Sequence, residues 1–174
     1  RYRIQSPDKD RHDRSCANLL MPVIPSTRIP TPVDNEPGKG ARGPVKFVLL
    51  HHEGCSRDGF HYRIHQDGSV RGLIKPDSRG QHPASLGIVL RGNLDRERPA
   101  GRQLDALKEL LLDLKLRYPD IGLGAHRQVR GDIKTSCPGK RFPMREIADW
   151  FDKELIRARD QKLQREVESQ YTPG

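Results

Sequence analysis

The chain has 174 residues, 33% of them hydrophobic, and 32 Lys+Arg against 23 Asp+Glu give a formal net charge of +9. That length fits one domain with an extension, and three Cys are too few for a disulfide scaffold. No apolar run approaches the roughly 18 residues of a membrane span, and no signal peptide is visible after Arg1. These features predict a soluble, basic domain with an anionic partner.

Residues 1–44 are predicted to form a Pro-rich arm or linker. Seven of the fourteen prolines lie there, and proline removes a backbone donor and extends the residue before it. Only Leu19–Ile24 is apolar enough to dock on a folded domain. Residues 45–144 carry 18 Lys/Arg and 11 Asp/Glu, a net charge of +7. This concentration favours a positive binding face, and a scattered excess that aids solubility is the alternative.

The segment after the arm is predicted to begin with β-strands. Apolar runs at Val45–Leu50 and Leu86–Leu90 are typical of central strands, and Ile121–Ala125 forms a shorter one. His61–His65 and Ser69–Ile74 flank an Asp-Gly pair that favours a tight hairpin turn.

Two helices complete the pattern. A helix over 102–117 follows from apolar residues at three- and four-residue spacing: Leu104, Leu107, Leu111 and Leu114. A second begins at Met144, with Ile147, Phe151, Leu155 and Ala158 on one face. We expect an α/β fold with a mixed central sheet flanked by helices over 45–158, and a charged helix end that frays over 159–174.

Three potential metal ligands lie where strands end. His51 ends the first central strand, His126 ends the last, and Cys137 follows on the next loop. Two imidazoles and one thiolate would leave an open fourth position on Zn²⁺, which a catalytic zinc requires. The chain has seven His, so core or surface histidines are the alternative reading. Cys55, four residues after His51, could compete as a ligand or pair with Cys16.

Motifs along residues 45–143 add a family resemblance. They are Phe47-Val48-Leu49-Leu50-His51-His52, the run from Gly59 to Val70, Gly80-Gln81-His82, the run from Leu86 to Asn93, Tyr118-Pro119, Ala125-His126-Arg127 and Thr135-Ser136-Cys137-Pro138-Gly139. In this collinear order the chain resembles the family-2 N-acetylmuramoyl-L-alanine amidases, a group that includes phage T7 lysozyme and the peptidoglycan recognition proteins. The resemblance implies their zinc amidase fold, with His51, His126 and Cys137 as ligands.

The same resemblance implies a substrate and a reaction. The substrate would be peptidoglycan, cut between the lactyl group of MurNAc and L-Ala. Bound Zn²⁺ would polarise the amide carbonyl and activate water, and the oxyanion would need a donor. Family members carry Lys or Thr two residues before the Cys, which implies this role for Thr135; a loop Thr that satisfies local backbone is the alternative.

Departures from the family pattern concern the proton-transferring groups. Many members have Tyr where this chain has Phe60, and Phe cannot transfer a proton. Others use a Glu at the position of Arg91. Glu53, two residues after His51, is a candidate base if the strand continues, although a solvated carboxylate is the alternative. Tyr62 is a second candidate, expected on the same strand face as Phe60.

Substrate contacts are expected from His82 and Asn93 in the shared motifs. The carboxylates of stem peptides are expected to bind arginine side chains, namely Arg71 and Arg127 together with Arg57, Arg79 and Arg91. We expect action at the bacterial envelope, in the periplasm, after secretion or as a phage lysin, by a monomer. A binding module of the same fold with poor turnover is the second hypothesis. A basic nucleic-acid binder is the third, and no recognition motif supports it.

Overall fold

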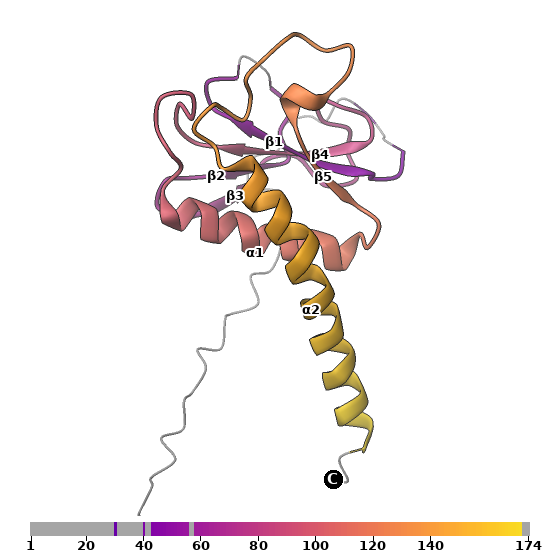
Figure 1. The fold of residues 1–174 in the computed structure, drawn as a ribbon. Helices are drawn as coiled ribbons and strands as arrows, with labels where there is room; N and C mark the ends of the chain where they lie inside the picture. Colours follow the sequence, from indigo (N-terminus) through magenta and orange to yellow (C-terminus); the bar gives the residue numbers. More distant parts are fainter. Residues whose placement is uncertain (1–29, 31–39, 41–42, 56–57, 172–174) are drawn as a thin grey trace, which may run out of the picture.

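A computed structural model describes residues 30, 40, 43–55 and 58–171 (Figure 1). The strands are β1 (Phe47–His52), β2 (Tyr62–Ile64), β3 (Val70–Gly72), β4 (Ser85–Leu90) and β5 (Gly122–Ala125). The helices are α1 (Gly101–Arg117) and α2 (Met144–Tyr171), with a 3₁₀ turn, η1, at His126–Gln128. Most of the predicted arm, including Leu19–Ile24, lies outside the described residues, as do Cys16 and Arg57.

The strands form one mixed sheet in the order β3-β2-β4-β1-β5. β1 lies between β4 and β5 and is parallel to both, while β2 is parallel to β4 and antiparallel to β3. The β2–β3 hairpin was predicted from its Asp-Gly pair and is confirmed. Gly68 has φ 87°, and the Asp67 carboxylate accepts hydrogen bonds from the backbone amide and hydroxyl of Ser69.

Alternation along the strands separates two faces of the sheet. The main core contains Val48 and Leu50 of β1 with Leu86, Ile88 and Leu90 of β4, packed with Leu107, Leu111 and Leu114 of α1. These leucines are the ones that the helical spacing predicts to face inward. A smaller cluster contains Phe60, Leu73, Ile74 and Val89. The sheet and its flanking helices confirm the expected fold class.

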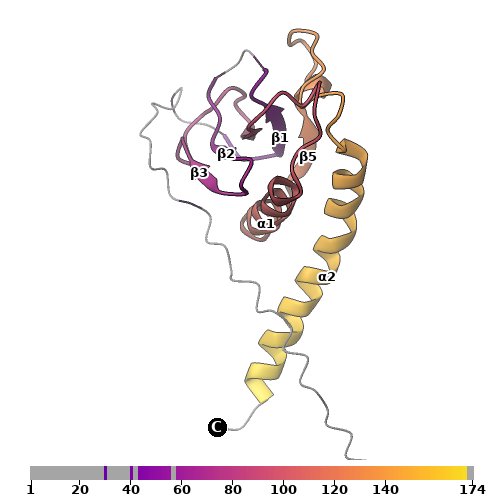
Figure 2. The same cartoon turned by 90° about the vertical axis from the view of Figure 1, so that its left-hand side faces the viewer.

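Helix α2 packs beside α1 and then continues beyond it (Figure 2). Ile147 and Phe151 are buried in the core, as the apolar pattern predicts. The helix runs past residue 158 to Tyr171, with Ile156 and Val167 exposed, so the predicted boundary at 158 falls within a continuous helix. Among the helices of the described residues, none combines the length and apolarity needed to cross a bilayer.

Candidate functional site

The site begins where two neighbouring parallel strands end. In the β1–β5 register the last pair is Leu50 with Ala125, and His51 and His126 are the next residues on the two chains. His51 is still in β1, where it pairs with Val89 of β4, and His126 begins the turn η1. Their ring centroids lie 4.7 Å apart, and both side chains are buried. The two histidines that the sequence places at strand ends are therefore brought together.

Cys137 reaches the same point on a returning loop. The Arg127 amide donates a hydrogen bond to the Cys137 carbonyl at 3.0 Å, and the Cys137 Sγ lies 3.8 Å from the Nδ1 of His51. Cys55, which is a free thiol, places its Sγ 3.3 Å from the Nδ1 of His126. One nitrogen or sulfur atom from each of these four residues lies within 4.8 Å of the others, a group that could hold a metal ion.

Asp95 anchors the loop on both sides of Cys137. Its carboxylate accepts hydrogen bonds from the Ser136 hydroxyl and from the Lys140 amide, each at 2.9 Å. The Lys140 hydrogen bond is the main reason that the pKa of Asp95 lies below its usual value. Gly139 has φ 116°, and a Cβ there would fall 2.4 Å from the Leu94 carbonyl, so this turn requires glycine.

Burial controls the protonation of the site. It lowers the pKa of His51 to about 3, and the neighbouring His126 and His82 act in the same direction, so the His51 imidazole is neutral near pH 7. Burial also raises the pKa of the Cys137 thiol well above its usual value. The Nε2 of His51 is buried and has no hydrogen-bond partner among the described residues. A neutral His51 imidazole next to the Cys137 thiol offers suitable donor atoms for a transition metal.

Asp132 is part of the site and was not predicted from the sequence. Its Oδ2 lies 2.8 Å from the Nε2 of His126 and 3.5 Å from the Nε2 of His82. The only sequence signal is an acidic residue six positions after His126, within a loop that has no periodicity. In the tautomer that donates a hydrogen bond from Nε2 to this carboxylate, the lone pair lies on Nδ1, which faces the cluster.

Thr135 and Glu53, the predicted catalytic residues, have local partners. The Thr135 hydroxyl oxygen accepts a hydrogen bond from the Cys137 amide at 3.1 Å, which is the loop role considered as the alternative. The Glu53 carboxylate is about half exposed, accepts a hydrogen bond from the Gly92 amide at 3.2 Å and lies 3.6 Å from the Nε of Arg91. These contacts place Glu53 at the carboxyl end of β4, and its role as a base stays a prediction.

Phe60 packs directly on the first histidine. Its ring centroid lies 4.8 Å from that of His51, and its side chain belongs to the smaller cluster. Tyr62 is fully buried in the main core instead, so the expectation that Phe60 and Tyr62 share a face is wrong. Phe60 lies before β2 begins, where strand alternation does not apply.

The predicted substrate contacts are spread unequally around this cluster. His82 is partly buried, with its ring centroid 5.7 Å from that of His126. Arg127 is exposed beside the Cys137 loop, where its Nη1 donates to the Ser136 carbonyl at 3.4 Å. Asn93 accepts a hydrogen bond from the Asp95 amide in the turn after β4. Arg71 lies on the edge strand β3, paired with Arg63 of β2.

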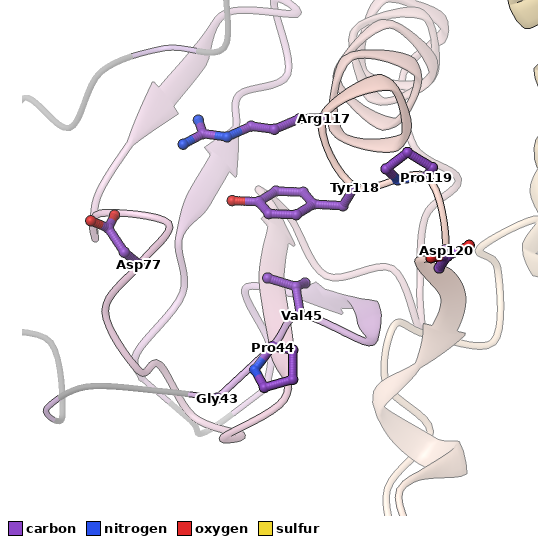
Figure 3. Close-up of a pocket in the computed structure, with 8 residues that line it drawn as sticks. All are labelled: Gly43, Pro44, Val45, Asp77, Arg117, Tyr118, Pro119 and Asp120. Atoms are coloured by element: carbon purple, nitrogen blue, oxygen red, sulfur yellow. The ribbon is translucent and has the colours of Figure 1, made fainter.

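A pocket of about 480 Å³ lies elsewhere (Figure 3). Val45 and Asp120, which precede β1 and β5, line it together with Arg117 and Tyr118. Val45 is six residues from His51, about 20 Å along an extended chain. The pocket is therefore at the amino ends of the parallel strands, whereas ligands of open α/β sheets bind at the carboxyl ends, where the cluster lies.

Comparison with known families then gives the assignment. The family described as N-acetylmuramoyl-L-alanine amidase, Amidase_2, matches residues 41–140, more than half of the chain. The chain belongs to the Amidase_2 family. The match contains all four residues of the cluster and ends before α2.

Relatives of this Amidase_2 chain include an endolysin of Klebsiella phage KP32. It is 31% identical over 111 residues, which cover 56% of the chain and 67% of the endolysin. Wild-type Drosophila PGRP-LB is 26% identical with a TM-score of 0.56, over 67% of this chain and 87% of that structure. A tyrosine-to-phenylalanine mutant of PGRP-LB in complex with tracheal cytotoxin matches with the same identity and TM-score, over 67% and 88% of the two chains.

The LysCS amidase from Clostridium intestinale URNW shares the fold of this Amidase_2 chain. It has 22% identity and a TM-score of 0.56, and the similarity covers 72% of this chain and 97% of LysCS. The predicted membership of the amidase and peptidoglycan recognition protein group is therefore confirmed.

Proposed function

We propose that this chain is a zinc-dependent amidase that hydrolyses the bond between the MurNAc lactyl group and L-Ala in peptidoglycan. The observation that carries the proposal is the convergence of His51, His126 and Cys137, which come from distant parts of the sequence. Cys137 and His51 are separated by 86 positions, yet their side chains meet at 3.8 Å. Family membership supplies the reaction class, and the cluster supplies residues suited to it.

The residues present fit a zinc ion. His51 and His126 would offer nitrogen, and Cys137 would offer sulfur, which are the donors that zinc prefers. Burial keeps the His51 ring neutral, so no proton has to leave it before a metal binds. The Nδ1 of that ring lies 3.8 Å from the Cys137 sulfur, so it faces the other donor atoms of the cluster.

The chain's own residues would prepare the reaction. A zinc ion held there would supply a Lewis acid for the amide carbonyl and for an attacking water. The Thr135 hydroxyl oxygen accepts a hydrogen bond from the Cys137 amide. The hydroxyl hydrogen is therefore still available to donate a hydrogen bond to the developing oxyanion. Asp132 holds the orientation of His126 through Nε2.

Proton transfer is assigned to the remaining polar groups. Glu53 is our candidate base, and its carboxylate would have to leave the Gly92 amide to reach the water. His82 lies beside Asp132 and His126, where it would contact the substrate near the scissile bond.

Peptidoglycan is the partner that best accounts for the charge. Net charge of +7 on residues 45–144 coincides with the segment that matches the family. Arg127 beside the Cys137 loop and Arg71 and Asn93 further out would bind stem peptides, whose carboxylates match guanidinium groups. The endolysin relative supports a lysin that acts on the cell wall, and it favours this partner over nucleic acid.

A binding module is the second candidate, favoured by Phe60. The Phe60 ring packs against His51 and brings no hydroxyl to the site. The tyrosine-to-phenylalanine mutant of PGRP-LB was solved with tracheal cytotoxin, so a protein of this family can lose a tyrosine hydroxyl and still bind a muropeptide. This chain would then bind peptidoglycan with little turnover.

Hydrolysis of purified sacculi separates the two candidates. We expect wild-type protein to release stem peptides with a free L-Ala amine, and we expect chelator or Cys137→Ser to abolish that release. Cys16→Ser is the matched control, because it removes a thiol outside the family match. Binding to sacculi without released peptide contradicts the enzyme and supports the binding module.

A further inference from the structure

Cys55 occupies a position at the cluster that the three-ligand proposal leaves open. It follows β1 by three residues, in a turn closed by a 2.9 Å hydrogen bond from its amide to the His52 carbonyl. This turn points the thiol at the Nδ1 of His126, 3.3 Å away. Asp132 occupies the other nitrogen of that ring, so Cys55 faces the nitrogen that is available as a ligand.

The spacing of the four ligand atoms matches one metal ion. Zinc–sulfur bonds of about 2.3 Å and zinc–nitrogen bonds of about 2.0 Å put the ligands of a tetrahedral site roughly 3.3–3.8 Å apart. The Cys55–His126 contact of 3.3 Å and the Cys137–His51 contact of 3.8 Å fall within that range. The group as a whole lies within 4.8 Å, so small movements would complete the tetrahedron.

We propose that Cys55 is a fourth protein ligand, which converts the site to a closed set of two histidines and two cysteines. The proposal rests on the proposed metal site at His51, His126 and Cys137. Closed sets of this kind are typical of structural zinc, whereas catalytic zinc keeps one position for water or substrate. Cys55 therefore blocks the position that the reaction needs, and hydrolysis requires its thiolate to withdraw.

Two features suit Cys55 to leave and return. Its side chain is partly exposed, whereas Cys137 is fully buried. Cys137 is also fixed by the loop that Asp95 anchors, while Cys55 is on a short turn at the end of β1. A second thiolate also changes the charge of the zinc site from +1 to zero, which removes the attraction for an anionic stem peptide.

Cobalt binding to the full chain tests the proposal without relying on activity. Co²⁺ bound to thiolates absorbs in the near ultraviolet, and the intensity of that band rises with the number of sulfur ligands. We expect wild-type protein to give about twice the band of Cys55→Ser or Cys55→Ala, because two thiolates become one. Cys16→Ser should keep the full band, and far-ultraviolet circular dichroism checks that each variant folds.

The outcomes separate this proposal from the proposed function. An unchanged band in both Cys55 variants overturns the fourth ligand and leaves the three-ligand site intact. A band absent from wild-type protein overturns the metal site itself. We also expect the Cys55 variants to bind Zn²⁺ about tenfold or more weakly in competition with a chelator, since loss of even an indirect partner costs that much. Equal affinity contradicts the proposal.

Discussion

Asp132 accepts the hydrogen bond of the His126 Nε2 at 2.8 Å, and this contact decides which nitrogen of His126 faces the cluster. In the tautomer that donates from Nε2 to this carboxylate, the lone pair lies on Nδ1. That Nδ1 faces the sulfur of Cys55. A carboxylate thus orients the second histidine of the site from outside the set of proposed ligands.

Removal of this carboxylate should weaken metal binding. We expect Asp132→Ala to lower Zn²⁺ affinity about 10- to 100-fold, because the ring loses the partner that fixes its tautomer and orientation. Competition with a chromophoric chelator measures the effect. Asp120→Ala, at the amino end of β5 and away from the cluster, is the matched control and should bind as wild type does. Equal affinity in the two variants would show that Asp132 has no part in the site.

Substitution of Phe60 by tyrosine should increase catalytic activity. We expect Phe60→Tyr to raise turnover on sacculi by about 10²-fold, because a phenol next to His51 could donate or transfer a proton, and such groups contribute at least that much. The rate of stem-peptide release measures it. Phe47→Tyr adds the same hydroxyl on an exposed side chain at the start of β1 and should change nothing. Unchanged turnover in a Phe60→Tyr protein that still binds metal would refute this role.

Asp95 should connect loop stability to the metal site. Its carboxylate accepts hydrogen bonds on both sides of Cys137, so Asp95→Ala releases the loop that carries the ligand. We expect the free energy of unfolding to fall by about 1–2 kcal/mol, with weaker zinc binding. Urea denaturation and chelator competition measure the two effects. Asp105→Ala, on an exposed position of α1, is the control; a loss of the same size there would show that the loop anchor is not the cause.

The neutral, buried His51 makes the metal-free protein sensitive to acid. Its pKa is about 3 in the folded chain and about 6.5 when unfolded. Between these two pH values the His51 side chain binds a proton in the unfolded state but not in the folded state. The free energy of unfolding therefore falls as the pH drops from about 6.5 towards 3, by up to about 1.4 kcal/mol per pH unit. Urea denaturation in chelator at pH 7.5 and pH 5 should show the loss, and His51→Gln should reduce it. An equal pH dependence in the variant would contradict the assignment.

The sequence predicted those parts of the site that follow from regular structure. His51 and His126 could be placed together because parallel neighbouring strands end at one edge, and the β1–β5 register confirms that arrangement. Three buried leucines of α1, Leu107, Leu111 and Leu114, follow from helical spacing alone. The placement of Cys137 came from its family motif.

The unpredicted features lie where the chain has no periodicity. Asp132 is in the loop after η1 and was not predicted. Cys55 was considered as a competing ligand, but the direction of its thiol is set by a turn after β1 and cannot be derived from spacing. Strand alternation was extended one step too far to Phe60, which precedes β2. Glu53 was expected to share a face with His51, and the structure pairs its carboxylate with Arg91 and the Gly92 amide.

Mass spectrometry of digested sacculi tests the central claim most directly, because it identifies the bond that is cut. We predict intact glycan strands with free lactyl carboxylates, together with stem peptides that begin with a free L-Ala amine. These products should disappear with chelator and in Cys137→Ser. Cleavage within the glycan or the stem peptide, or the same products from Cys137→Ser, would contradict the account.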